Sequence, residues 1–305
     1  MIKLQHPQVP LSTLEIIPVY MKEVEKYLGK IKLNEIKVIF FGSDLFVIPI
    51  LQALEDNFEV VAVVTASDSA VANYLKGPIF TSGKLDENFQ SQISNFKPDL
   101  FVVASFGKII PKFILNIPKF GSLNVHPSLL PKYRGPSPIQ QAILNGDSET
   151  GITIIKMDEE VDHGPIIYQD TLELFNEDNF DTLSKKMFQQ AAEVLPKIIE
   201  DFAAGKITLK KQNDAIATFC DKLTRESGYF PIDNQPDPQK LNRMIRAYYP
   251  WPGVWTRFRP SGSSGQARIV KFLPGNMLQM EGKKAISLKD FLNGYPDFPL
   301  KSTNK

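Results

Sequence analysis

Apolar runs alternate with segments of helical spacing from about residue 36 onward. The runs at 37–41, 60–64 and 100–104 are continuous, as expected for strands that are buried on both faces. The intervening segments 46–54 and 87–96 carry apolar residues at helical period. Strands of this kind, each followed by a helix, are typical of a parallel sheet with helices on both sides. The pattern predicts an α/β fold with a Rossmann-like, mostly parallel sheet.

The alternation continues to Gly205, which is expected to end a long amphipathic helix. We therefore assign residues 36–205 to one domain and residues 1–35 to an N-terminal extension without an assigned function, in which 19–28 has the spacing of a short helix. The tight turn at Gly42 lacks the G-x-G-x-x-G pattern, so we interpret it as a turn that binds no dinucleotide. The remaining predicted elements are strands at 123–125, 151–157 and 165–169 and helices at 138–144 and 179–204.

Residues 206–305 differ in composition from the preceding domain. A helix is predicted at 241–248 and short strands near 269–273 and 277–280, with a Ser/Gly link at 261–265. We predict a small, reduced, β-rich domain of OB or barrel-like type, which leans on its neighbour because so short a segment buries little core by itself. Two interpretations of its aromatic residues stay open, a nucleic-acid surface and a small core with basic residues at its rim. These aromatic residues are Tyr248, Tyr249, Trp251, Trp255 and Phe258.

The composition argues against several classes of protein, but the net charge does not indicate what kind of partner the protein binds. The 35 Lys and Arg residues nearly balance the 34 Asp and Glu residues, so the net charge of +1 argues neither for nor against a polyanionic partner. The single cysteine, Cys220, excludes an intrachain disulfide, and three scattered histidines without a cysteine cluster predict no metal site. No apolar run reaches the ~20 residues of a membrane span, and the start lacks a signal-peptide pattern. We expect a soluble, cytoplasmic monomer.

The candidate chemistry lies between residues 121 and 169. Asn124 and His126 stand at i and i+2 of a predicted strand, which puts both side chains on one face. Four prolines and a glycine follow within a dozen residues and predict a rigid loop that suits a pocket wall. The segment 157–167 adds acids and a second histidine at a tight turn. Amide, imidazole and carboxylate groups together form a candidate set for acid/base chemistry and oxyanion stabilisation.

These segments resemble the superfamily of formyltransferases that use 10-formyltetrahydrofolate. The shared hallmark is Asn124-x-His126-Pro127-Ser128-Leu129-Leu130-Pro131 with Asp162 in Val161-Asp162-His163-Gly164, which alone would also fit glycinamide ribonucleotide transformylases. More selective matches indicate the methionyl-tRNA formyltransferase family, and the resemblance covers about residues 36–260. These matches are Arg134-Gly135-Pro136-Ser137-Pro138-Ile139-Gln140, Thr150-Gly151-Ile152-Thr153-Ile154 and Ile245-Arg246-Ala247-Tyr248-Tyr249-Pro250-Trp251-Pro252-Gly253.

The resemblance implies a catalytic trio of Asn124, His126 and Asp162. Attack of an amine on a formyl carbon creates an oxyanion, which Asn124 and a protonated His126 are suited to stabilise. Asp162 would orient the imidazole and help to relay the proton of the attacking amine. We interpret the adjacent His163 as a turn residue outside the catalytic set.

The resemblance also implies two binding regions, for the folate donor and for the initiator methionyl-tRNA acceptor. The donor would lie against the backbone of two turns, with Ile109, Ile110 and Val161 lining the pocket. The complete set of expected donor contacts is Ser105, Phe106, Gly107, Ile109, Ile110, Ser128, Leu129, Leu130, Pro131 and Val161. The expected transfer-RNA contacts are Lys76, Arg134, Arg243 and Arg246.

Two departures from the family pattern concern transfer-RNA recognition. The segment 65–76, where the family has a long basic loop, is short and carries only Lys76, and the C-terminal domain is cut down around its Ser/Gly link. Other functions therefore stay open: a formyltransferase for a small amine such as an amino sugar nucleotide or glycinamide ribonucleotide, a formyltetrahydrofolate hydrolase, or a folate- or RNA-binding protein without turnover. The segment 245–255 favours the transfer-RNA enzyme, and the intact trio argues against a protein without turnover.

Overall fold

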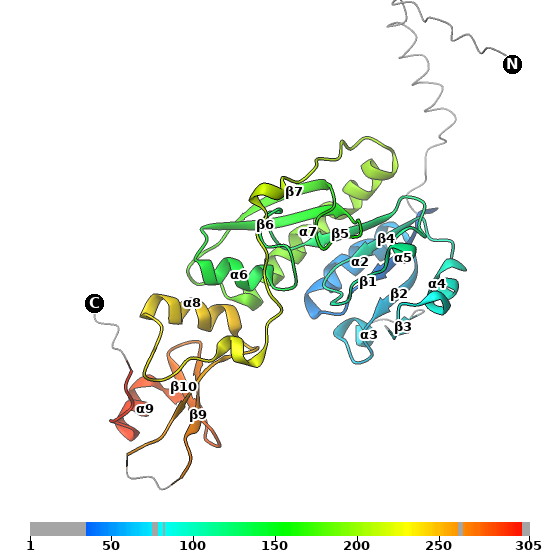
Figure 1. Cartoon of the computed structure of the whole chain (residues 1–305). Helices are drawn as coiled ribbons and strands as arrows, with labels where there is room; N and C mark the ends of the chain where they lie inside the picture. Colours follow the sequence, from blue (N-terminus) through cyan, green and yellow to red (C-terminus); the bar gives the residue numbers. More distant parts are fainter. Residues whose placement is uncertain (1–34, 75–78, 82, 262–264, 301–305) are drawn as a thin grey trace, which may run out of the picture.

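The computed structural model describes residues 35–74, 79–81, 83–261 and 265–300 (Figure 1). Residues 1–34 of the predicted extension (1–35), the candidate Lys76 and residues 262–264 of the Ser/Gly link lie outside the described residues. Within the described part, no helix is long and apolar enough to cross a membrane. The domain boundaries near 35 and 205 stay a prediction.

A seven-stranded sheet forms the centre of the larger part, with the strand order β3-β2-β1-β4-β5-β6-β7. The first five strands of this order run parallel, and β6 and β7 are antiparallel to their neighbours. The structure therefore confirms the predicted mostly parallel α/β sheet. The strands are β1 (Lys37–Phe41), β2 (Glu59–Thr65), β3 (Ile79–Thr81), β4 (Leu100–Val103), β5 (Ser122–His126), β6 (Glu149–Lys156) and β7 (Ile166–Glu173).

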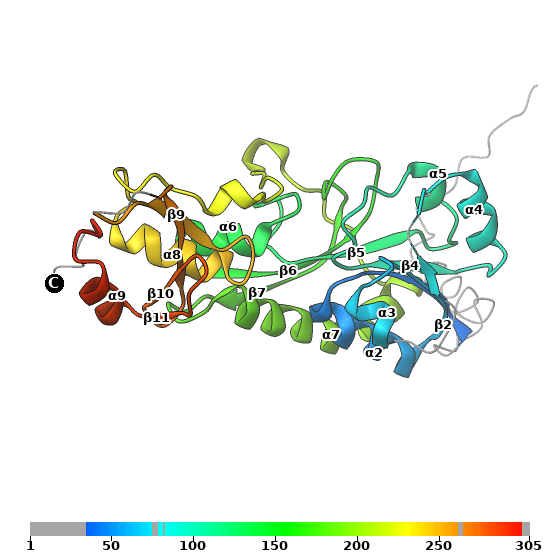
Figure 2. The same cartoon turned by 90° about the horizontal axis from the view of Figure 1, so that it is seen from below.

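Helices cover both faces of this sheet, as the continuous apolar runs predict. Strand β1 shows why, because Val38 and Phe40 belong to one core cluster while Ile39 and Phe41 belong to another. Helices α2 and α7 lie on the first face and α4 and α5 on the second (Figure 2). These helices are α2 (Ile48–Asn57), α4 (Glu87–Ser94), α5 (Lys112–Leu115) and α7 (Phe180–Ala203), with a 3₁₀ turn η3 (Leu45–Val47) before α2.

Helix α7 begins with a capping box that its sequence supplies locally. The Asn179 side chain accepts a hydrogen bond from the Thr182 amide, and the Thr182 hydroxyl accepts one from the Asn179 amide. Gly205 follows the helix with φ of +67°, a left-handed conformation that glycine adopts without steric cost. The predicted helix at 179–204 is confirmed to within one residue at each end.

The hydrophobic pattern did not predict several of the short elements. The helix α3 (Ala70–Tyr74) and the edge strand β3 were not predicted, since each spans only a turn or a few residues. Strand β8 (Val254–Phe258) was missed because it follows the Pro250–Gly253 segment directly. The predicted helix at 138–144 is present as α6 (Pro138–Asn145), which ends at Gly146 with φ of +70°.

The C-terminal unit, defined here as residues 238–300, is built on an antiparallel sheet of four strands in the order β11-β10-β9-β8. Its core shares one continuous cluster with the larger sheet, which confirms that it leans on its neighbour. Helix α8 packs against α6, and both views place the two helices side by side (Figures 1 and 2). The further elements are α8 (Pro238–Tyr248), β9 (Arg268–Leu273), β10 (Met277–Met280), β11 (Ile286–Ser287) and α9 (Leu288–Gly294).

Candidate active site

Asn124 and His126 lie on β5, between the parallel strand β4 and the antiparallel strand β6. Leu123 and Val125 point into the larger core cluster, so Asn124 and His126 share the opposite face. This confirms the predicted arrangement of the two side chains. His126 is only 4% exposed, whereas Asn124 is partly open to solvent. The pair therefore stands at the carboxyl edge of the parallel strands, where open α/β sheets bind ligands.

Asp162 joins these two residues from a loop 36 positions further along the chain than His126. Its Oδ1 accepts a hydrogen bond from Asn124 Nδ2 at 3.0 Å, and its Oδ2 accepts one from the Gly135 amide at 2.8 Å. Oδ2 also lies 3.5 Å from His126 Nδ1. The three residues that the sequence singled out are thus brought together around one carboxylate.

The contacts of His126 define which ring nitrogen is available for chemistry. Nε2 lies 2.9 Å from the carbonyl oxygen of Tyr133, and because a carbonyl only accepts, Nε2 must carry a proton and donate it. Nδ1 is therefore the atom that gains or loses a proton. Its separation of 3.5 Å from Asp162 Oδ2 permits ion-pair attraction but is too long for a good hydrogen bond. Nδ1 keeps its hydrogen-bonding capacity for reacting atoms.

The loop after His126 is rigid, as its prolines predict, and its interior contacts explain how. The Ser128 hydroxyl donates to the Lys132 carbonyl at 2.6 Å, and the Leu130 amide donates to Thr153 Oγ1 at 3.1 Å. The Leu130–Pro131 peptide bond is cis. Ser128 and Leu130 are buried and Leu129 and Pro131 are half-buried, so the first two shape the loop from inside. Their expected contact with the donor stays a prediction.

Two further loops lie side by side at the same edge of the sheet. An ion pair between Lys112, the first residue of α5, and Glu159 joins the segment after β4 to the loop that carries Asp162. Ile109 and Val161, one from each loop, are 77% and 52% exposed although both are large and apolar. Exposed apolar side chains of this kind are suited to contact an aromatic ligand. Their expected contact with the donor stays a prediction.

The structure corrects the expectation for Ile110. Its side chain is only 5% exposed and packs in the second core cluster together with Phe106, so it does not line an open pocket. Phe106 is held there by an edge-to-face contact with Phe41. Ser105 and Gly107 adopt left-handed φ angles of +49° and +73° and are exposed, which leaves the backbone of this turn as the expected contact surface.

The structure places Arg134, an expected transfer-RNA contact, in an ion pair inside the protein. Its side chain is 4% exposed, and its guanidinium donates to Gln212 Oε1 and to Asp214 Oδ1. The hydrogen bond from Arg134 holds the pKa of Asp214 below its ordinary value. Because the guanidinium is buried and bonded through Nε and Nη2 to Gln212 and Asp214, the structure gives Arg134 an internal role in place of the expected contact with transfer RNA. Gln212 was missed in the sequence analysis because it lies in a polar stretch without periodicity.

His163 also has partners of its own, in agreement with its interpretation as a turn residue. Its Nδ1 lies 2.7 Å from Asp158 Oδ2, and its Nε2 lies 3.5 Å from Asp214 Oδ2. The hydrogen bond to Asp158 is the main cause that raises the pKa of His163 above 6.5. These contacts turn the ring away from the trio and toward the acids around it.

The arginines of α8 are likewise engaged within the fold. The Arg246 guanidinium donates to the Asp178 carbonyl at 2.6 Å and to Asn242 Oδ1 at 3.0 Å, and burial lowers its pKa. The Arg243 side chain lies against Gly146 at the end of α6. These contacts favour a role in docking α8, and phosphate binding by either arginine stays a prediction.

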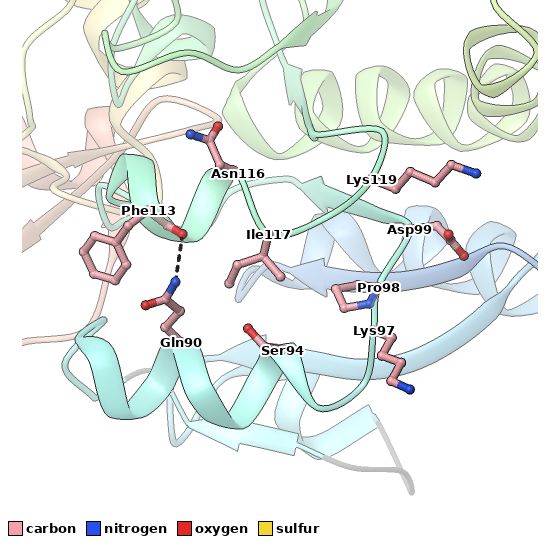
Figure 3. Close-up of a pocket in the computed structure, with 9 residues that line it drawn as sticks. All are labelled: Gln90, Ser94, Lys97, Pro98, Asp99, Phe113, Asn116, Ile117 and Lys119. Atoms are coloured by element: carbon pink, nitrogen blue, oxygen red, sulfur yellow. Dashed lines mark hydrogen bonds between the residues drawn. The ribbon is translucent and has the colours of Figure 1, made fainter.

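A separate cavity of about 540 Å³ lies at the other edge of the sheet (Figure 3). It is found between α4 and α5, next to Asp99 and Lys119, which precede β4 and β5. None of the trio lines it. The described residues contain no group of three or more His, Cys, Asp or Glu side chains that could hold a metal ion.

Comparison with known proteins identifies related sequences and folds. The family model described as "Formyl transferase" matches residues 36–199. A methionyl-tRNA formyltransferase of Roseiflexus sp. (strain RS-1) is 39% identical over 241 residues, covering 73% of this chain and 74% of that protein. One of Halalkalibacterium halodurans is 37% identical over 301 residues, covering 85% of this chain and 94% of that protein.

Solved structures support the fold at lower identity. A methionyl-tRNA formyltransferase from Clostridium thermocellum has a TM-score of 0.55 at 20% identity, covering 82% of this chain and 96% of that chain. A sugar N-formyltransferase from Shewanella sp FDAARGOS_354 has a TM-score of 0.62 at 19% identity, covering 82% and 99%. Because proteins with different acceptors share this architecture, the fold by itself does not identify the acceptor.

Proposed function

Since the chain belongs to the formyl transferase family and, within it, to the methionyl-tRNA formyltransferases, we propose that it transfers the formyl group of 10-formyltetrahydrofolate to the amino group of initiator methionyl-tRNA. The observation that carries the proposal is the Asp162 carboxylate, which is bonded to Asn124 and faces His126 Nδ1. The acceptor belongs to translation, so we place the enzyme in the cytoplasm.

Asn124 is positioned to stabilise negative charge. Its Nδ2 carries two hydrogens. One is donated in a hydrogen bond to Asp162, and the other remains free to bind the oxygen of the tetrahedral intermediate. A preorganised donor of this kind typically contributes about 10²–10³-fold to the rate of acyl transfer. The carboxylate holds the amide before the substrates arrive, so no reorientation is needed during the reaction.

His126 supplies the second charge-stabilising group in the proposed mechanism. When Nδ1 is protonated, the imidazolium faces the Asp162 carboxylate and presents its proton toward the reacting atoms. Tyr133 keeps the ring in place through Nε2, so rotation of the imidazole is prevented. The Asp162 carboxylate is held in place by hydrogen bonds from the Asn124 side chain and the Gly135 amide.

The proton balance of the transfer follows from these positions. The amine nitrogen forms a bond to the formyl carbon, and the bond from that carbon to the donor nitrogen breaks. The Asp162 carboxylate accepts the ammonium proton, and His126 Nδ1 donates its own proton to the leaving nitrogen of the donor. Transfer of the proton from Asp162 to His126 Nδ1 then restores the starting state. The donor supplies the activated formyl group, and Ile109 and Val161 would hold its ring system by apolar contact.

The experiment that tests the function is a formyl-transfer assay with 10-formyltetrahydrofolate and four acceptors in separate reactions. These are charged initiator methionyl-tRNA, an amino sugar nucleotide, glycinamide ribonucleotide and water. We expect rapid transfer to the charged RNA alone. Transfer only to a small amine, or only hydrolysis of the donor, would contradict the proposed acceptor while leaving the chemistry of the trio in place.

A further inference from the structure

Gln212 is hydrogen-bonded to the backbone of the loop that carries Asp162. Its Nε2 donates to the carbonyl oxygens of Asp162 and Gly164, both at 2.8 Å. Its Oε1 accepts two hydrogen bonds from Arg134, at 3.1 and 2.9 Å. Gln212 is buried, with only 5% of its surface exposed to solvent. Both hydrogens and both lone pairs of the amide are used, so the group is fully satisfied.

The partners of Gln212 also settle the orientation of its amide. A rotated amide would place its oxygen against two carbonyl oxygens and its NH₂ group against the guanidinium of Arg134, and both contacts repel. The buried charge of Arg134 therefore aligns Gln212, and Asp214 compensates that charge at 2.7 Å. Arg134, Gln212 and the Asp162 backbone form a directed chain of hydrogen bonds.

Asp162 needs such support because of its backbone conformation. Its φ of +51° lies in the left-handed region, which costs a residue other than glycine of order 1 kcal/mol or more. Residues in this region persist where surrounding contacts hold them. The two carbonyl groups that Gln212 binds flank His163, so one amide holds the backbone that directly follows the left-handed residue Asp162.

The segment that carries Gln212 is anchored on both sides of this residue. Lys210 exchanges two backbone hydrogen bonds with Ile166 at the start of β7, and Phe219 pairs with Arg134. This segment follows α7 and runs past β7 and β6 before the chain enters the C-terminal unit (Figure 1). Gln212 lies beyond residue 199, where the match to the family model ends.

We propose that Gln212 is a positioning residue for the transfer reaction, which acts by holding the backbone of Asp162 so that its carboxylate meets Asn124 and His126. The inference rests on the proposed function. Gln212 touches no reacting atom, and its effect passes through the left-handed turn at Asp162. Misplacement of a catalytic group by about 1 Å lowers a rate by as much as ~10²-fold, so loss of the two carbonyl contacts has a measurable consequence.

The test uses Gln212→Glu in the full-length protein, with Gln189→Glu as the matched control. The glutamate keeps the size of the side chain and its pairing with Arg134 but replaces the two donors with a carboxylate that repels the carbonyl groups. Gln189 is exposed on α7, where the same chemical change disturbs only its contact with Glu193. We expect kcat to fall about 10–100-fold in Gln212→Glu, with KM for both substrates within about threefold and the control unchanged.

Two further readouts separate positioning from a purely structural role. In the Asp162→Asn background, Gln212→Glu should lower kcat by less than about a further twofold. The effects of substitutions at two residues that act as one unit do not add. Amide hydrogen exchange over residues 158–164 should accelerate in Gln212→Glu and stay unchanged in the control. The exchange measurement needs no turnover, so it reports on the turn even if the wild-type protein fails to formylate methionyl-tRNA.

The outcomes are distinct. An unchanged kcat per folded molecule in Gln212→Glu, with wild-type activity present, would overturn the proposal, as would a full multiplicative loss in the Asp162→Asn background. Unchanged exchange over residues 158–164 would also overturn it. Absence of transfer by the wild-type protein would count against the proposed function instead. If Gln212→Glu does not fold, Gln212→Met, which lacks both the donors and the new charge, takes its place in the same measurements.

Discussion

The carboxyl edge of the large sheet is held by hydrogen bonds between buried polar groups, whereas the C-terminal unit is held by packed aromatic rings. At the edge, the Asp162 carboxylate and the Arg134 guanidinium each have several partners at defined angles. In the C-terminal unit, Phe291 packs against Tyr295 and Phe298 with ring centroids 4.9 and 5.1 Å apart. Hydrogen bonds are directional and apolar contacts are not. The first region is therefore suited to hold reactive groups in place, and the second to supply stability.

The largest expected effect comes from breaking the polar region at its reactive centre. We expect His126→Ala to lower kcat for formyl transfer by about 10³-fold or more, because both the charge-stabilising group and the proton relay are lost. Folding and donor binding should be retained, since the loop after His126 keeps its contacts with Thr153. Steady-state kinetics with circular dichroism and donor titration measure both. Asp162→Asn serves as a second variant, and normal turnover in either would contradict the catalytic assignment.

The matching change in the aromatic region is Phe291→Ala. Phe291 is fully buried, so the substitution should lower the free energy of unfolding of the C-terminal unit by about 3–5 kcal/mol. Urea denaturation followed by tryptophan fluorescence reports this loss, because Trp251 and Trp255 both lie in that unit. The kcat of the molecules that remain folded should stay within about twofold of wild type, and a large fall would show that the two regions are coupled.

A smaller effect is expected where the two regions meet, at Arg246. Arg246→Ala removes the charged hydrogen bond to the Asp178 carbonyl and should lower stability by about 1–3 kcal/mol. If the guanidinium only docks α8, the salt dependence of KM for methionyl-tRNA should not change. A shallower salt slope in the variant would instead show that Arg246 also contacts phosphate.

The smallest expected effect is on the pH dependence of folding stability, through His163 in the polar region. His163 has a raised pKa in the folded protein, mainly through its bond to Asp158, so its protonated form stabilises the fold. This contribution is fully present below 6.5, the ordinary value, and is lost as the pH rises through the raised pKa. The stability difference between wild type and His163→Gln should therefore be larger at pH 6 than at pH 8.5, and below about 1 kcal/mol. Equal differences at both pH values would contradict the assigned contact.

The amino-acid sequence was informative wherever local rules apply. The continuous apolar runs predicted strands β1, β2 and β4, and the period of α7 predicted that helix nearly to the residue. The spacing of Asn124 and His126 predicted a shared face, because alternation along a strand depends only on the backbone. The motif around Asp162 marked a third candidate, and the structure places its carboxylate beside Asn124 and His126.

What the sequence determined by itself is the order of the longer strands and helices, since each depends on a local pattern of apolar residues, and its motifs marked the candidate reactive groups. Only the tertiary structure decided how these groups are held. The contacts of Arg134 with Gln212 and Asp214 join residues 78 and 80 positions apart, and no local pattern marks them. The same holds for Ile110, whose burial depends on a core assembled from distant strands. Contacts between residues so far apart in the sequence form only when the whole domain folds, so no short segment of sequence predicts them.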